Sequence, residues 1–136
     1  MRHIRRFAVA FLVLMLVGCA SERVVRLYGG ATAPAAQGTV KSSKGPNDNL
    51  RLKISVQHLA PPDRLAPGAT VFVVWARPTI QGGFAQNLGA LKIDKDLTGT
   101  LETVTPLRDF DLIITPESSA EVQSPSNISV LMAHLM

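Results

Sequence analysis

Residues 50–57 read LRLKISVQ and residues 71–76 read VFVVWA. In the first stretch every second residue from Leu50 to Val56 is apolar, and the residues between them are polar. A period of two is typical of a strand that buries one face, whereas an unbroken apolar run is typical of a strand buried on both faces. The two stretches together predict a domain built from antiparallel strands.

Further strands are expected around these two stretches, because short apolar runs recur between turns rich in Pro and Gly. They include 88–93, 100–105, 128–136 and a strand through Phe110, Leu112 and Ile114, with a hairpin loop at 94–99 and a polar loop at 116–127. No stretch free of Gly and Pro has a helical period of apolar residues. We therefore expect an all-β fold over residues 38–136, a small antiparallel β-sandwich of immunoglobulin-like type with about seven strands.

The positive charge of the chain is concentrated at its amino end. Three of the 14 lysines and arginines, Arg2, Arg5 and Arg6, precede an apolar block, which leaves 11 against 10 Asp and Glu, a net charge of +1. These remaining charges are scattered, whereas phosphate binding needs a basic patch, so no nucleic-acid partner is expected. The single cysteine cannot close a disulfide within the chain or build a thiolate zinc site.

Residues 1–18 have the parts of a secretory signal peptide. A start with three arginines and His3 is followed by eleven apolar residues at 7–17 and then by Gly18. Eleven residues suit the ~7–15-residue core of a cleaved signal, while a helix that spans a bilayer needs ~20. The positive end favours the cytoplasmic side, so we expect the rest of the chain to be exported.

Leu16-Val17-Gly18-Cys19 resembles the bacterial lipobox, in which an apolar pair and a small residue precede a cysteine. The resemblance implies cleavage between Gly18 and Cys19, a diacylglycerol thioether on Cys19 and an acyl chain on its new amino group. No other cofactor is expected. More than one acyl chain is enough for stable membrane anchoring. The residue after the cysteine is Ala20 and not aspartate. If the organism is Gram-negative, the resemblance therefore implies that the lipid anchor lies in the outer membrane and that the domain faces the periplasm.

Two other fates of the amino end stay open. Residues 18–20 (GCA) also have the small-x-small pattern of ordinary signal cleavage, which would make Ser21 the first residue. An uncleaved membrane helix would instead have to take the charge of Glu22 or Arg23 into the bilayer.

Residues 19–37 are expected to form a lipidated tether, because small residues, Pro and Gln dominate 29–38 and no apolar period is present there. This composition is interrupted by Val24, Val25, Leu27 and Tyr28. These four residues form either a short strand docked on the domain or a segment lying at the membrane interface.

Four motifs follow one another in the second half of the chain: VFVVWA at 71–76, LGAL at 88–91, FDLIITPE at 110–117 and SPS at 124–126. Their order resembles the extracytoplasmic carboxy-terminal domain of bacterial anti-sigma-K-type factors, over about residues 50–136. The resemblance implies a small β-sandwich outside the cytoplasm. Phe72 and Asn127 depart from the Tyr and Gly of that family, and only six residues precede the apolar block. We therefore do not expect sigma-factor binding.

Asp94, Asp96 and Thr98, followed by Gly99, match the first half of a calcium loop, which has oxygen ligands at positions 1, 3 and 5 and glycine at 6. Position 12 holds Thr105 in place of the bidentate glutamate, so the three residues are weak candidates and a polar hairpin turn is favoured. No metal site is predicted.

Four other residues have a structural and a functional interpretation. Asp109 and Asp111 share a strand face and are either plain surface charge or a carboxylate pair for hydrolysis. His58 has the parity of the buried residues of 50–57, which predicts a position at the rim or in the core; a metal site shared with His134 would need a third ligand that the sequence does not supply. Trp75 is expected to be a buried anchor, with a surface platform for sugars as the alternative.

No motif of a serine triad or a phosphate-binding loop is present in the sequence. We therefore expect a lipid-anchored, non-catalytic envelope protein whose domain binds a protein or another envelope component. The alternative is an accessory or relic of anti-sigma signalling that senses the state of the envelope.

Overall fold

The computed structural model describes residues 21–136, so the expected signal peptide 1–18, its cleavage site at Gly18 and the lipidation site Cys19 lie outside the described residues. Apart from strands, the described chain has two single turns of helix, η1 (Pro46–Asp48) and α1 (Pro62–Leu65). Neither of these helical turns within 21–136 approaches the length and apolar character that a membrane span requires.

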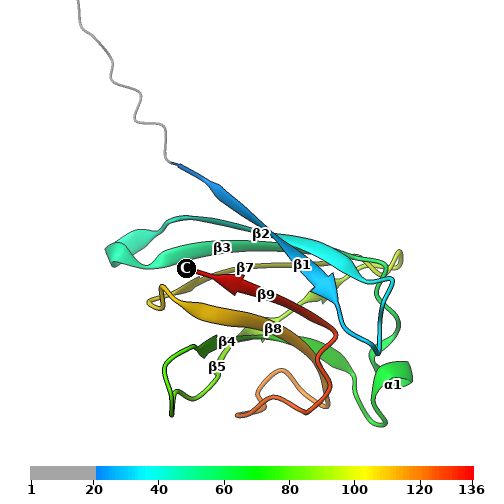
Figure 1. Ribbon diagram of the computed structural model, residues 1–136. Helices are drawn as coiled ribbons and strands as arrows, with labels where there is room; N and C mark the ends of the chain where they lie inside the picture. Colours follow the sequence, from blue (N-terminus) through cyan, green and yellow to red (C-terminus); the bar gives the residue numbers. More distant parts are fainter. Residues whose placement is uncertain (1–20) are drawn as a thin grey trace, which may run out of the picture.

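The strands form one antiparallel sheet: β1 (Arg23–Gly29), β2 (Gln37–Lys44), β3 (Leu50–Gln57), β4 (Val71–Pro78), β5 (Gln86–Ala90), β6 (Lys92–Ile93), β7 (Gly99–Thr105), β8 (Phe110–Glu117) and β9 (Leu131–Leu135). Their order across the sheet is β5-β4-β8-β9-β1-β2-β3-β7-β6, and each neighbouring pair is antiparallel. The sheet curls until β1, β2, β3 and β7 face β9, β8, β4 and β5, which makes it nearly barrel-shaped (Figure 1).

The two end strands of the sheet are neighbours in the chain, because a single residue, Leu91, joins β5 to β6. β5 pairs with β4, while β6 pairs with β7. The N–H of Leu91 donates to the carbonyl oxygen of Phe72 at 2.8 Å. Just before the bend, Gly89 has a φ of 124°, a conformation that glycine adopts without a steric penalty. One bent segment therefore brings the two ends of the sheet together.

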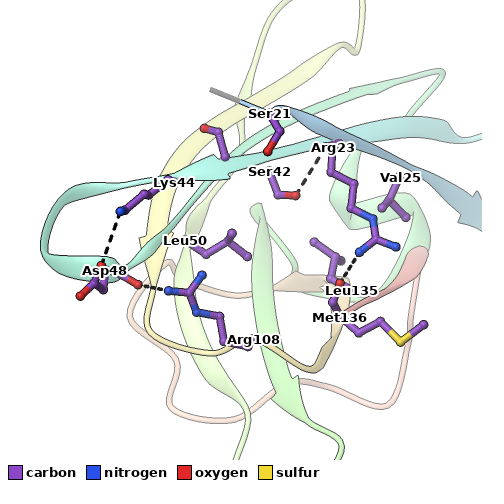
Figure 2. A pocket seen from close by; sticks show the side chains of 11 residues that line it. Ser21, Arg23, Val25, Ser42, Lys44, Asp48, Leu50, Arg108, Leu135 and Met136 are labelled. Carbon is purple, nitrogen blue, oxygen red and sulfur yellow. Dashed lines mark hydrogen bonds and ion pairs between the residues drawn. The ribbon is translucent and has the colours of Figure 1, made fainter. Parts of the chain in front are cut away.

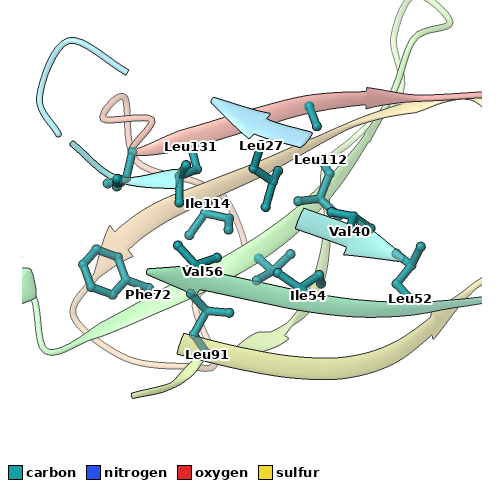
Figure 3. Close-up of a cluster of buried hydrophobic side chains, with 14 of the residues drawn as sticks. Leu27, Val40, Leu52, Ile54, Val56, Phe72, Leu91, Leu112, Ile114 and Leu131 are labelled. Carbon is teal, nitrogen blue, oxygen red and sulfur yellow. The ribbon is translucent and has the colours of Figure 1, made fainter. Parts of the chain in front are cut away.

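β3 and β4 occupy the two stretches from which the fold was predicted. The alternation in β3 is confirmed, because Leu52, Ile54 and Val56 are buried and the residues between them are exposed. The interior between the two halves of the sheet is filled by apolar side chains from both (Figure 3), among them Leu27, Val40, Phe72, Leu112, Ile114 and Leu131. The apolar inner face of each strand is therefore shut away from water.

A second apolar cluster lies on the outer face of the sheet, where β4 and β8 meet. It consists of Val73, Trp75 and Ile113, against which Val122 from the loop 118–130 packs. Trp75 is fully buried, so its expected role as an anchor is confirmed and the alternative of a surface platform for sugars is wrong. The loop covers the second face of β4, which explains why this strand has no polar face.

The expected all-β fold is confirmed, but the expected seven-stranded sandwich differs from the structure. The nine strands belong to one continuous sheet. The bend at Leu91 divides the expected strand 88–93 into β5 and β6, and it links the two halves of the sheet that a sandwich would keep apart. β2 was not expected, because its short polar sequence has only Val40 as a large apolar residue.

β1 lies within the segment that was expected to be a tether. It pairs with β2 over six residues, from Arg23↔Ser42 to Tyr28↔Gln37. The structure therefore takes the first of the two alternatives for this segment, a strand docked on the domain. Leu27 explains the docking, because its side chain is 2% exposed and belongs to the interior cluster.

The expectation for His58 was wrong. Its φ is 59°, so the chain leaves the extended conformation there and the alternation of β3 ends. The His58 side chain is exposed, and Leu59 takes the next buried position.

We expect Ile54→Ala to lower the free energy of unfolding by about 2–5 kcal/mol, because Ile54 is 2% exposed in the interior. The neighbouring Lys53→Ala should change it by no more than about 0.5 kcal/mol, because Lys53 points to solvent. Urea denaturation of the two variants measures the difference. Equal effects of the two substitutions would contradict the inward face assigned to β3.

Candidate functional site

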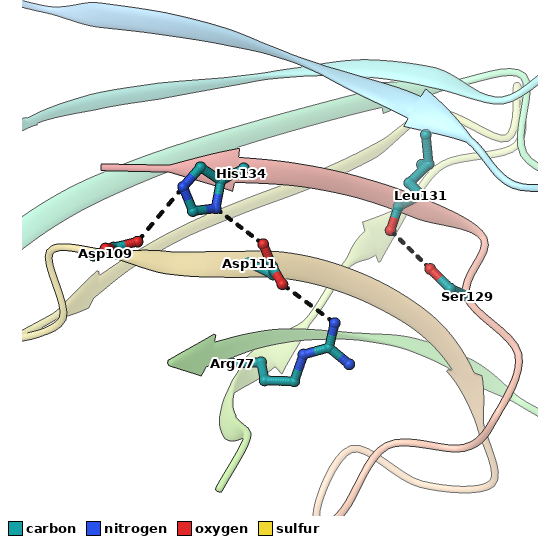
Figure 4. Close-up of polar contacts among 6 residues, drawn as sticks. All are labelled: Arg77, Asp109, Asp111, Ser129, Leu131 and His134. Carbon is teal, nitrogen blue, oxygen red and sulfur yellow. Dashed lines mark hydrogen bonds and ion pairs between the residues drawn. The ribbon is translucent and has the colours of Figure 1, made fainter. Parts of the chain in front are cut away.

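Four charged or titratable side chains form a row on the outer face of β4, β8 and β9 (Figure 4). Asp111 lies opposite Arg77 of β4 and opposite His134 of β9. Arg77 Nη2 is 3.2 Å from Asp111 Oδ2, and His134 Nδ1 is 3.0 Å from Asp111 Oδ1. His134 Nε2 is 3.5 Å from Asp109 Oδ1. Strand register thus brings the expected Asp109 and Asp111 pair together with two partners that sequence reasoning missed.

The row is arranged so that its charges compensate one another. Partial burial raises the pKa of Asp111, but hydrogen bonds from His134 and Arg77 and the charges of both residues outweigh burial and hold the pKa below its ordinary value of 3.8. Asp111 is therefore an ionised partner of Arg77 at neutral pH. Cross-strand pairs of opposite charge are typical of a solvated sheet face and stabilise it by about 0.2–1 kcal/mol.

The lowered pKa of Asp111 gives a testable dependence of stability on pH. A carboxyl whose pKa falls on folding contributes stability above its unfolded-state pKa, and this is lost as the pH drops through the folded-state pKa. The relevant window therefore lies below pH 3.8. We expect Asp111→Asn to flatten the decline of unfolding free energy in that window, because the amide does not titrate.

Urea denaturation at a series of pH values from about 5 to about 2 measures this slope. Arg77→Ala should also flatten it, because Arg77 lowers the pKa of Asp111. Arg64→Ala is the matched control, since Arg64 is exposed on α1 and not among the causes of that shift. A wild-type slope in Asp111→Asn would contradict the assignment.

A buried hydrogen-bonded network lies beneath the loop 118–130. Trp75 Nε1 donates to Thr115 Oγ1 at 2.8 Å, and this hydroxyl donates to Glu117 Oε1 at 2.6 Å. The backbone N–H of Ser126 donates to the same carboxylate oxygen at 2.7 Å. The network fastens the loop to β8, and its residues come from three of the motifs that resemble anti-sigma-K-type factors. Packing of the loop accounts for these motif residues.

Removing the central hydroxyl should leave two buried polar groups without their partner. We expect Thr115→Val to lower the free energy of unfolding by about 1–3 kcal/mol, since Trp75 Nε1 and Glu117 lose their shared hydrogen-bond partner. Thr115→Ser, which keeps the hydroxyl, should cost less. Thr70→Val is the control, because the bond from Thr70 Oγ1 to Ser118 O is exposed. Equal unfolding midpoints for the Thr115→Val and Thr70→Val variants would contradict the role of the network.

The loop with the calcium-like spacing folds as a hairpin turn. Asp94 Oδ1 accepts the backbone N–H groups of Asp96 and Thr98, each at 3.0 Å. Thr105 is buried at the far end of β7, where its hydroxyl donates to Gln86 Oε1 at 3.0 Å. Thr105, at position 12 of the calcium-loop pattern, therefore lies away from Asp94, Asp96 and Thr98. Within residues 21–136, no group of three or more His, Cys, Asp or Glu side chains is arranged to hold a metal ion.

Apart from the two-residue end strand β6, the strands pair least where β1 meets β9. These strands pair only at Tyr28↔Met132 and Gly29↔Leu131, whereas β1 pairs with β2 over six residues. From there the start of β1 and the end of β9 diverge (Figure 1). Within the described chain, the facing edges of 23–27 and 133–135 have no strand partner. We call these two facing edges the β1–β9 seam.

A hollow of about 500 Å³ opens at the β1–β9 seam (Figure 2). Apolar side chains that line it include Val25, Leu50 and Leu135, all of which belong to the interior cluster or pack against it. Its rim holds Arg23, Lys44, Asp48, Arg108 and Met136. The hollow therefore joins an apolar floor to a rim of long charged side chains.

The rim has an excess of positive side chains. The Arg23 guanidinium donates to the backbone oxygen of Met136 across the seam, and the Arg108 guanidinium donates to the backbone oxygen of Asp48. Lys44 Nζ is 3.9 Å from Asp48 Oδ1, but both side chains are largely exposed, so this ion pair contributes little. Three cationic side chains thus face the Asp48 side chain and the main-chain carboxylate of Met136, the last residue of the sequence, so the rim keeps a positive excess that suits an anionic ligand.

A second hollow of about 640 Å³ lies at the other end of β1, beside residues 34–38. Arg26 is the one charged side chain among the described residues that line it, and the others include Tyr28, Pro34 and Gln57. It offers little to select a ligand by charge. We therefore regard the hollow at the β1–β9 seam as the candidate functional site.

No protein-family model matches this chain, and no curated protein sequence matches it significantly. Its function is therefore argued from the residues and their geometry.

Proposed function

We propose that this protein is a lipid-anchored, non-catalytic protein of the bacterial cell envelope whose β-rich domain binds another protein or an envelope component. One observation carries the proposal, the order of segments at the amino end. A positive start and eleven apolar residues lead to the lipobox-like Leu16-Val17-Gly18-Cys19, and β1 begins four residues later at Arg23. The anchor is the diacylglycerol and the N-acyl chain on Cys19.

An anchor on Cys19 would hold the domain close to the membrane. Because β1 begins at Arg23, the link spans four residue steps, and an extended chain covers at most ~3.6 Å per residue, or ~14 Å in all. The start of β1 and the hollow beside it would lie near the lipid headgroups. In a Gram-negative organism we place this anchor in the outer membrane, with the domain facing the periplasm.

The arrangement of the acidic groups supports binding rather than catalysis. Asp109 and Asp111 are engaged with His134 and Arg77 on a strand surface, and Glu117 is engaged in the buried network. None of these residues lines the hollow at the β1–β9 seam. The near-neutral charge of the chain after residue 6 favours a protein or envelope component over nucleic acid.

The anchor is tested by expressing the full chain in a bacterium supplied with labelled palmitate. We expect the label to be incorporated into the wild type and into Ser21→Ala, and to be lost in Cys19→Ser, because the thioether needs the sulfur. Mass spectrometry of the amino-terminal peptide from the membrane fraction should find a chain that begins at acylated Cys19. A chain that begins at Ser21, or an unmodified Cys19 thiol, would remove the lipid anchor from the proposal.

A further inference from the structure

We propose that the β1–β9 seam binds an extended acidic segment of a partner protein, which adds to the sheet as a strand between β1 and β9. This inference rests on the proposed binding role of the domain and names the class of partner for it. The two unpaired edges and the charge of the rim carry the argument.

The first argument is the state of the backbone at the seam. Residues 23–27 and 133–135 pair with β2 and β8 on one side and have no strand partner on the other within the described chain. Backbone N–H and C=O groups are strong hydrogen-bonding groups, and an exposed strand edge is a ready template for another strand. Strand addition uses such main-chain bonds for affinity. A strand placed here would find partners on both of its sides.

The second argument is that no backbone pairing holds the seam shut at its open end. The contact that crosses the seam there runs from the long Arg23 side chain to the backbone oxygen of Met136 (Figure 2). A side chain can swing aside, whereas a ladder of backbone bonds would have to break. Neighbouring strands of a sheet lie about 4.8 Å apart, so an added strand needs this distance on each of its two sides. Because β1 and β9 diverge beyond their last paired residues, the gap between them widens toward the open end of the seam.

The third argument is the chemistry of the lining, which selects the side chains of the segment. Alternate residues of an added strand would point to the apolar floor formed by Val25, Leu50 and Leu135. Arg108 makes no ion pair within the described chain and donates to a neutral acceptor, the backbone oxygen of Asp48. A carboxylate of the segment would give the Arg108 guanidinium a charged acceptor, which forms stronger hydrogen bonds. The matching segment therefore alternates apolar and acidic residues.

The test uses the full chain in detergent micelles and two capped peptides of about seven residues. One peptide alternates valine with glutamate, and the other alternates valine with lysine. Amide hydrogen exchange is measured with and without each peptide. We expect the glutamate peptide to slow exchange by about tenfold or more at those amides of 23–27 and 133–135 that face the seam, about every second one, because they gain partners. The lysine peptide should not slow exchange at these positions.

Variants of the rim test the charge argument. Arg108→Glu should weaken binding of the glutamate peptide by about tenfold, since it reverses one rim charge. Lys95→Glu is the matched control, because Lys95 is an exposed lysine in the loop after β6 and does not line the hollow. Its affinity should stay within about twofold of the wild type. Equal losses in the two variants would overturn the role of the rim.

Three results would overturn the proposal: no protection at the seam with the glutamate peptide, equal protection with both peptides, or protection confined to other strands.

A second experiment tests whether the seam binds a membrane instead of a peptide. It compares the full chain in vesicles that contain phosphatidylglycerol with the full chain in vesicles of phosphatidylcholine alone. Equal seam protection by the anionic vesicles without peptide would make the seam a lipid-docking surface and overturn the proposal. Peptide binding does not depend on Cys19, so a chain that binds the peptide with an unmodified thiol would remove the anchor and keep this inference.

Discussion

The hydrogen bond from the Leu91 N–H to Phe72 O marks the place where one extended segment leaves β4 and joins β7. β5 and β6 are the two end strands of the nine-stranded sheet, and the bend holds them next to each other. Without the bend, the apolar inner faces of β3 and β8 would each lack a facing layer. The bend therefore brings the two halves of the sheet around one shared interior. The two ends of the sheet meet there, and apart from the end strand β6 the shortest pairing lies halfway along the strand order, between β9 and β1.

The outer face of β4 and β8 explains why an apolar strand can lie in a sheet with one interior. The loop 118–130 adds a second small core over Val73, Trp75 and Ile113, and the hydrogen bonds from Trp75 through Thr115 to Glu117 fasten it. Residues that carry the resemblance to anti-sigma-K-type factors meet at this place. For Trp75, Thr115, Glu117 and Ser126, burial and hydrogen bonding beneath the loop account for the pattern as a requirement of folding.

The β1–β9 seam connects the fold to the proposed function. The same strand that would follow the lipid anchor, β1, contributes one edge of the seam and Arg23 of its rim. A partner that added a strand there would be held within reach of the membrane surface, and the short link would limit the orientations of the domain. The apolar floor and the cationic rim lie at one end of the sheet, because the start of β1, the β2–β3 turn, the β7–β8 turn and the end of β9 meet there.

The sequence by itself determined the class of the fold and the course of β3, β4, β7 and β8, because a period of two and the Pro and Gly turns are local properties of the chain. It also placed Trp75 in an apolar cluster and kept Asp94, Asp96 and Thr98 in a turn. The tertiary structure decided the docking of β1, the bend at Leu91, the exposure of His58 and the meeting of Asp111 with Arg77 and His134. These features depend on which strands pair and in which register, and periodicity along one strand does not contain that information.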